Sequence, residues 1–210
     1  MNERRRPGRP RKTDTDTSEA IADAARLRFA NRGFDATSLR EIAADANIDV
    51  ALIAYRFGGK TGLWKSIVSQ AAKELQDALD AALAETQGAS PKQRLHHAMK
   101  TFLGYLLSRP EVPRLLLRDI TIDSERSQWL LDELSLPLHR YFVELAQAAA
   151  ANCERKVEHL QFRVASFIYS ASSTVARRER LTKLADGIAD DSSFEAALEA
   201  TLIEEALRCD

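Results

Sequence analysis

Residues 36–64 read ATSLREIAADANIDVALIAYRFGGKTGLW and contain the start and stop signals of two short helices. Ser38, with Glu41 three residues later, predicts a capping box at the start of the first helix. Asp49 predicts the N-cap of the second helix, and Gly58 supplies its C-terminal stop. Two helices of about two turns each, joined by a short turn, constitute a helix-turn-helix.

A further helix is predicted upstream of this pair. Asp16 and Glu19 have the spacing of a second capping box, and apolar residues from Ile21 onward recur at helical spacing until Gly33. We therefore predict a three-helix unit with a helix-turn-helix over residues 15–60, the kind of unit that binds DNA.

The remaining residues, 61–210, also have helical periodicity. A long helix is predicted from Lys60 to Glu85, and further helices at roughly 92–109, 111–121, 125–151, 155–185 and 193–208. Pro137 lies inside one of these and should kink or divide it. No segment has the pattern of a strand. The predicted fold class is therefore all-α, with the N-terminal helix-turn-helix domain followed by a larger helical domain.

The N-terminal segment, residues 1–14, is predicted to be a disordered basic arm. Residues 1–12 hold six Arg and Lys side chains against one acidic side chain, although the net charge of the whole chain is −1. Two prolines and a glycine disfavour a helix there. The GRP core with its flanking Arg and Lys resembles an AT-hook, which lies in the minor groove of A/T-rich DNA. The alternative is a tether that attracts phosphates without regard to sequence.

Beyond the helix-turn-helix itself, the sequence resembles the tetracycline-repressor (TetR) family of bacterial regulators. FANRGFDATSLREIAADA is similar to the family's first two helices, and IAYRFGGKTGLW is similar to its recognition helix and the start of the next. The resemblance covers about residues 18–68, and NIDVALIAYRFGGKTGL is most similar to a CecR-like subgroup. It implies that the larger domain binds a ligand and dimerises, and that the protein represses transcription as a homodimer on a pseudo-palindromic operator.

Three residues depart from the family's pattern. Arg28 stands where an apolar residue is usual, which implies either a slightly rotated first helix or a snorkelling side chain. Ala54 replaces a common aromatic residue or Asn. Arg56 replaces the usual His, and it either contacts a phosphate or fills a solvated edge.

The side chains of the second helix of the pair that do not face the core are the candidate base readers. Val50 and Ala51 suit a thymine methyl group, and Tyr55 can donate to a base or a phosphate. The resemblance adds Thr37, Ser38 and Lys60 as phosphate clamps, although N-capping alone would account for Ser38. The full set of predicted DNA contacts is Arg9, Arg11, Lys12, Thr37, Ser38, Asp49, Val50, Ala51, Tyr55, Arg56 and Lys60.

Two apolar stripes near the C-terminus are predicted to form the dimer interface. They consist of Leu160, Val164, Phe167, Ile168 and Ala171 in one helix and Phe194, Leu198 and Leu202 in the other. The same stripes would also suit packing within one chain.

A ligand pocket is expected among the helices from residue 92 to residue 180, because those helices make up most of the larger domain. The pocket candidates are Phe102, Arg118, Trp129, Phe142, Arg163 and Phe167. Tyr105, His139 and Tyr169 are further aromatic or polar residues in the same region.

The sequence contains no pattern that indicates catalysis or metal binding. The adjacent His96 and His97 point to different faces of a helix, and no glutamate–histidine motif or nucleophile elbow occurs. We predict no catalytic residue, no cofactor and no metal site.

No stretch approaches the ~18 uninterrupted apolar residues of a membrane span. We expect a cytoplasmic protein whose partners are double-stranded DNA, a second copy of itself and an unknown small-molecule effector, with no membrane. The alternative function is that of a nonspecific, A/T-preferring architectural DNA-binding protein.

Overall fold

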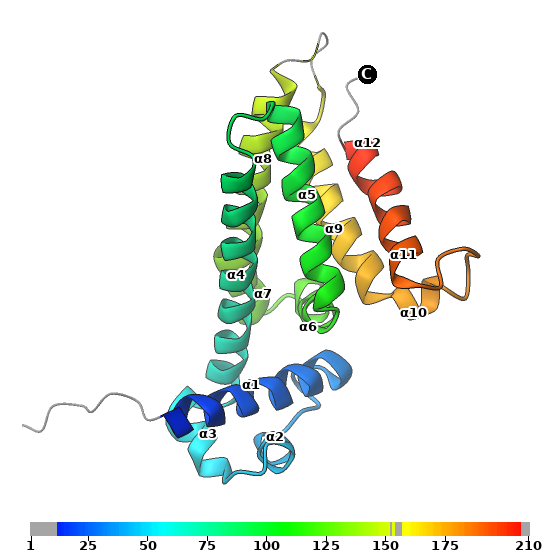
Figure 1. Cartoon of the computed structure of the whole chain (residues 1–210). Helices are drawn as coiled ribbons and strands as arrows, with labels where there is room; N and C mark the ends of the chain where they lie inside the picture. The colour runs from blue at the N-terminus through cyan, green and yellow to red at the C-terminus, as the bar shows by residue number, and fades with distance from the viewer. Residues whose placement is uncertain (1–11, 152, 154–156, 207–210) are drawn as a thin grey trace, which may run out of the picture. The chain divides into compact units, whose positions relative to one another are not determined.

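The chain consists of helices joined by turns (Figure 1). The computed structural model describes residues 12–151, 153 and 157–206, and no strand occurs among them, which confirms the predicted all-α fold class. The chain divides after Ile67 into two compact units, unit 1 (residues 1–67) and unit 2 (residues 68–210). Arg9 and Arg11 of the predicted basic arm lie outside the described residues.

Unit 1 contains three helices and the start of a fourth. They are α1 (Lys12–Arg32), α2 (Leu39–Asp45), α3 (Val50–Phe57) and α4 (Lys60–Glu85). Both predicted caps are present: Ser38 and Glu41 form the full capping box of α2, and the Asp49 side chain accepts from a backbone N–H of α3. Gly58 ends α3 in the left-handed conformation, with φ 71°. Local signals therefore set the limits of both short helices.

Helix α1 begins at Lys12, four residues before the predicted cap at Asp16. The arm predicted to be disordered up to residue 14 is therefore too long by three residues. Pro10 restricts the residue before it and not the residues after it, so a helix can extend back to this point. Aspartates at positions 14 and 16 also favour a helix N-terminus, where the macrodipole is positive.

The core of unit 1 takes at least one large residue from each of its helices. Ile21 of α1, Ile42 of α2, Ile53 of α3 and Leu63 and Trp64 of α4 are all fully buried. Every helix of unit 1, including the start of α4, therefore contributes to its core.

Unit 2 contains the rest of α4 and the remaining helices. These are α5 (Pro91–Ser108), α6 (Glu111–Ile120), α7 (Glu125–Leu130), the π-helical turn η1 (Leu131–Ser135), α8 (Leu136–Ala150), α9 (Leu160–Ala176), α10 (Arg178–Leu181), α11 (Asp191–Leu198), the π-helical turn η2 (Glu199–Ile203) and α12 (Glu204–Ala206). None of the helices in the described ranges is long and apolar enough to cross a bilayer.

Three phenylalanines form the centre of unit 2. Phe102 of α5, Phe142 of α8 and Phe167 of α9 have ring centroids 5.7–5.8 Å apart in every pair, and all three rings are buried. Each pair of rings is tilted or edge-to-face, the arrangement that aromatic quadrupoles favour. The cluster holds α5, α8 and α9 together beside one another (Figure 1).

The predicted helix 125–151, which contains Pro137, is divided into α7, η1 and α8, and the chain stays helical from one to the next. Proline lacks the N–H that would bond to the carbonyl of residue 133, and the chain accommodates the loss in the π-helical turn η1 just before α8. A π-helical turn often marks a functional position, and η1 proves to be part of a cavity wall.

A buried ion pair joins α6 to α7. Both Nε and Nη2 of Arg126 donate to Oδ1 of Asp119, at 3.1 and 2.9 Å, and the Asp119 side chain is only 6% exposed. Such a pair ties two short helices together, because one buried carboxylate oxygen accepts two hydrogen bonds from the neighbouring helix.

Candidate nucleic-acid interface and apolar pocket

Helix α3 presents a row of small and aromatic side chains to solvent. It buries Ile53 completely, whereas Tyr55 is 87% exposed and Val50 is 36% exposed. Ala51 and Ala54 are exposed as well. This face therefore carries the predicted base readers, and Ala54, which the sequence analysis treated only as a departure, lies among them.

Asp49 and Ser38 are both occupied as N-caps. An Asp49 carboxylate oxygen accepts from the Ala51 N–H at 2.7 Å. The Ser38 hydroxyl accepts from the Glu41 N–H at 3.3 Å and donates to the Glu41 carboxylate at 2.9 Å. Capping therefore accounts for both residues, although both remain exposed at the ends of their helices.

Thr37 does not fit its predicted role as a phosphate clamp. It is only 2% exposed, and its hydroxyl donates to the Gly33 carbonyl at 2.8 Å. A buried hydroxyl with an internal acceptor cannot reach a phosphate, so the predicted contact is wrong for this side chain.

Lys60 and Arg56 bind within unit 1. The Lys60 ammonium lies 3.3 Å from the Asp35 carbonyl oxygen and 4.4 Å from the centroid of the Phe34 ring. The Arg56 guanidinium donates to the Ser18 hydroxyl and so ties α3 to α1. Arg56 thus joins α3 to α1, Lys60 joins the start of α4 to the segment between α1 and α2, and the pattern of the sequence did not show these contacts.

Arg40 is a candidate that the sequence analysis missed. It is exposed at the second position of α2, and no ion pair involves it in the described part of the chain. A cation beside a helix N-terminus is suited to a phosphate contact. Its position two residues after the Ser38 cap was the sequence signal that could have identified it.

Lys12, another of the predicted DNA contacts, is the first residue of α1.

Gly62 permits a very close approach between the end of α3 and the start of α4. A Cβ atom at this position would lie 1.8 Å from the Phe57 carbonyl oxygen and 3.0 Å from the Phe57 carbonyl carbon. Only glycine fits there, because the obstacle is backbone and cannot rotate away.

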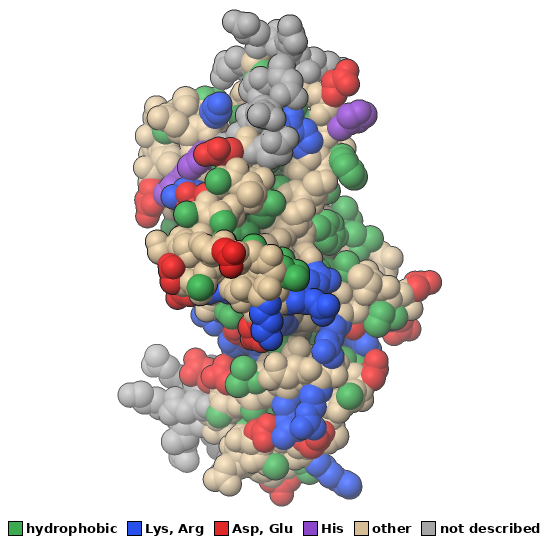
Figure 2. All heavy atoms as spheres, turned by 90° about the vertical axis from the view of Figure 1, so that its right-hand side faces the viewer, with side chains coloured by type: hydrophobic (Ala, Val, Ile, Leu, Met, Phe, Trp, Pro, Cys, Tyr) green, Lys and Arg blue, Asp and Glu red, His purple; other side chains and the backbone are tan. Residues whose placement is uncertain are grey.

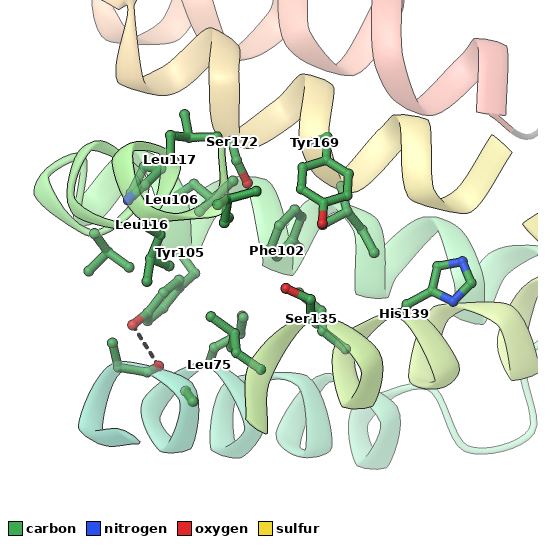
Figure 3. A pocket seen from close by; sticks show the side chains of 18 of the residues that line it. Leu75, Phe102, Tyr105, Leu106, Leu116, Leu117, Ser135, His139, Tyr169 and Ser172 are labelled. Atoms are coloured by element: carbon green, nitrogen blue, oxygen red, sulfur yellow. Dashed lines mark hydrogen bonds between the residues drawn. The ribbon is translucent and has the colours of Figure 1, made fainter. Parts of the chain in front are cut away.

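Unit 2 contains an apolar pocket of about 280 Å³ (Figure 3). Helices α4, α5, α6, α8 and α9 and the turn η1 supply its walls. Of the predicted pocket residues, Phe102 lines it, as do Tyr105, His139 and Tyr169. Phe142 and Phe167 lie in the aromatic core, and Arg118, Trp129 and Arg163 do not line this pocket, whereas Arg163 and Phe167 line a second groove beside α9.

Comparison with known proteins agrees with this architecture in both units. The model of bacterial regulatory proteins of the tetR family matches residues 21–67. The probable HTH-type transcriptional regulator YttP of Bacillus subtilis is 33% identical over 108 residues, which are 51% of this chain and 52% of that protein. The chain thus matches about half the length of this curated relative. A tetR-family regulatory protein from Rhodococcus RHA1 superposes with a TM-score of 0.73 at 18% identity, covering 92% of this chain and 96% of its own.

Residues 21–67 match the tetR family of bacterial regulatory proteins, and the chain has the fold of solved TetR-family structures. A second solved structure, a TetR-like transcriptional regulator from Rhodococcus sp. RHA1, has a TM-score of 0.69 at 19% identity, covering 94% of this chain and 98% of its own. Its likeness shows that both helical units follow the TetR fold. The CecR-like subgroup stays a prediction.

Arg28, which departs from the TetR pattern, forms an ion-pair cluster. Its guanidinium bonds to both carboxylate oxygens of Asp45 and lies 3.0 Å from the Glu41 carboxylate, which Arg32 also contacts at 3.2 Å. The charged head of Arg28 is thus paired with two carboxylates. The Ser38 backbone N–H, the Ser38 hydroxyl and the two arginines lower the pKa of Glu41, and the hydrogen bonds from Arg28 lower the pKa of Asp45.

This cluster predicts an acid-dependent loss of stability in unit 1. Carboxylates with lowered pKa values in the folded state stabilise it above their ordinary values, 4.5 for Glu41 and 3.8 for Asp45, and this contribution is lost as the pH falls through the lowered values. Arg28→Gln should reduce the free energy of unfolding in urea near neutral pH and make no difference at about pH 2. Lys73→Ala, which removes an exposed pair with Asp77, is the control. A difference that persists at low pH contradicts the assignment.

The residues predicted for the dimer interface are mostly core. Val164, Phe167, Ala171, Phe194 and Leu198 are at most 4% exposed within the single chain. Ile168 lines the pocket, and Leu160 and Leu202 pack against the core. Most of these side chains therefore face the interior of unit 2, whereas Phe167 and Leu202 also line a second groove beside α9.

Proposed function

We propose that this protein is an effector-responsive, sequence-specific transcriptional regulator that represses by binding a pseudo-palindromic operator as a homodimer. The observation that carries the proposal is the presence of two features in one chain. Unit 1 has a helix-turn-helix with an exposed reading face, and unit 2 has an apolar pocket of ligand size. A DNA-binding protein without a sensing role has no need for the second feature. The proposed function also puts the protein in the cytoplasm.

Helix α3 would enter the major groove with its exposed face toward the bases. Val50, Ala51 and Ala54 suit the methyl groups of thymines, and the Tyr55 hydroxyl can donate to a base or a phosphate. Arg40 and the N-termini of α2 and α4 would contact phosphates, which fix the register. Apolar contacts would carry most of the base discrimination from this helix.

We propose that helix α4 couples effector binding in the pocket to DNA binding by unit 1. Its first residues include Gly62, against which α3 ends, and its later residues Ala71, Ala72 and Leu75 line the pocket. An effector that binds one arrangement of α4 more tightly than another would change the fraction of molecules that can bind DNA.

A groove on the outer side of α9 is the proposed dimer interface. Phe162, Ser166 and Ser170 of α9 line it together with Thr201 and Ala206 from the C-terminal helices. Phe162 is 73% exposed, and an exposed aromatic residue beside small residues is typical of an interface centre. Figure 2 views the side of the molecule that carries α10–α12, and hydrophobic side chains are exposed on it.

Phe162→Asp should convert the dimer to a monomer. A two-fold axis places the same residue in the interface twice, so the substitution removes two aromatic rings and adds two charges that must be desolvated. We expect the dimer dissociation constant to rise by more than about 100-fold, and operator affinity to fall with it. Light scattering at micromolar concentration measures the first effect. Leu184→Asp is the matched control, because Leu184 is 75% exposed outside the groove. A variant that stays dimeric contradicts the interface.

The alternative function is a nonspecific, A/T-preferring architectural protein. The ratio of the dissociation constants for a scrambled and a selected duplex, at one salt concentration, separates the two functions. A regulator should show a ratio of about 1,000 or more, whereas an architectural protein should show a ratio near one for duplexes of equal composition.

A further inference from the structure

The walls of the unit 2 pocket disfavour the binding of charged ligands. Its volume of about 280 Å³ lies near the lower end of the range for small-molecule sites, ~300–1,000 Å³. None of the described residues that line it is Asp, Glu, Lys or Arg. An ion that entered would leave its hydration shell without meeting a counterion, which strongly disfavours binding.

The pocket nevertheless offers hydrogen-bonding groups from its walls. Figure 3 shows the hydroxyl oxygens of Ser135 and Tyr169 pointing into the same space beside Phe102. Neither hydroxyl makes a hydrogen bond within the described part of the chain. Ser135 belongs to η1 and Tyr169 to α9, so two separate walls supply the pair.

The other large polar groups of the pocket are already bonded to the protein. The Tyr105 hydroxyl donates to the Ala71 carbonyl at 2.9 Å, and His139 Nε2 lies 2.9 Å from the Gln161 carbonyl oxygen, to which it donates. The hydroxyls of Ser135 and Tyr169 therefore remain available to a ligand, as does the Ser172 hydroxyl one turn further along α9.

We propose that the pocket selects an uncharged, largely apolar small molecule with one hydrogen-bonding end, and that Ser135 and Tyr169 hold that end. This inference rests on the proposed function, because it names the chemical class of the effector. The apolar body of the molecule would lie against aliphatic side chains of α6 such as Leu116 and Leu117, which line the same cavity.

Matched probes test the class of ligand directly. 1-Octanol, octanoate and octylammonium share one chain and differ in charge, and calorimetric titration of the full-length protein gives a dissociation constant for each. We expect 1-octanol to bind at least about tenfold more tightly than either ion. Equal or tighter binding of an ion, or no saturable binding of 1-octanol, overturns the proposal.

Two substitutions test whether the hydroxyls of Ser135 and Tyr169 bind the ligand. Tyr169→Phe and Ser135→Ala should each weaken 1-octanol binding by about three- to tenfold, the effect of one hydrogen bond. Ser69→Ala is the matched control, since Ser69 is exposed on α4 and does not line the pocket. If neither variant changes the dissociation constant, the assigned hydroxyls are wrong.

A DNA titration in the presence of each probe separates failure of this inference from failure of the proposed function. Selective 1-octanol binding with unchanged DNA affinity supports the ligand class and contradicts effector response. Release of DNA by octanoate or octylammonium alone supports effector response and overturns the ligand class.

Discussion

Replacing Gly62 with alanine should weaken specific DNA binding by roughly 100-fold and destabilise unit 1 by about 3 kcal/mol or more. The added Cβ would lie 1.8 Å from the Phe57 carbonyl oxygen, far inside any tolerated contact. The start of α4 must therefore move away from the end of α3. Since Leu63 and Trp64 of α4 and Ile53 of α3 share one core, the reading helix moves with it. A loss of one or two base contacts, at about 1–3 kcal/mol each, lowers DNA affinity by roughly 100-fold.

Two other glycines control for the effect of substitution itself. Gly104 in α5 has open space around its Cβ position, and Gly104→Ala should stabilise the protein by about 0.4–1 kcal/mol because alanine favours helix. Gly58 also has open space but a φ of +71°, so Gly58→Ala should cost about 1 kcal/mol. Thermal unfolding and fluorescence anisotropy on a selected duplex measure both effects. Wild-type melting and affinity in Gly62→Ala would refute the close approach.

Asp119→Ala should destabilise unit 2 by about 3–5 kcal/mol, the second large effect. The substitution deprives Arg126, whose side chain is 18% exposed, of a carboxylate that accepts two hydrogen bonds. The paired substitution Asp119→Leu with Arg126→Met should restore most of the stability, because it removes both charges and fills similar volume. Urea unfolding of the two variants and the wild type gives the free energies.

The exposed pair of Arg114 and Glu179 is the control for this prediction. Glu179 is 84% exposed in that pair, so Glu179→Ala should cost less than about 1 kcal/mol. An Asp119→Ala cost as small as the Glu179→Ala cost would show that the buried pair contributes little. Asp119→Ala should also weaken probe binding, since Leu116, Leu117 and Ile120 line the pocket from the same helix, α6.

The helix-turn-helix could be predicted because its signals are local. Ser38, Glu41, Asp49 and Gly58 act within one helical turn, and each forms the cap that its spacing predicted. The role of Thr37 could not be predicted in the same way. Its hydroxyl meets the Gly33 carbonyl only because the turn between α1 and α2 folds back and buries it.

The pocket and the interface could not be predicted because amphipathic periodicity does not distinguish core, cavity and interface. Phe102, Phe142 and Phe167 occupy equivalent inward positions, yet only Phe102 reaches the cavity. Conversely, the groove proposed as the interface combines Phe162 and serines from outside the apolar stripes with Phe167 and Leu202 from within them. The π-helical turn η1, which brings Ser135 into the pocket, has Pro137 as its sequence signal, but the consequence of a proline depends on the packing around it.

The most direct test is selection of bound duplexes from a random pool by the full-length protein near physiological salt. A sequence-specific dimeric regulator predicts enrichment of one site with two-fold symmetry, whose half-sites each accept one α3 helix. Enrichment of A/T-rich DNA without symmetry would contradict the proposed function.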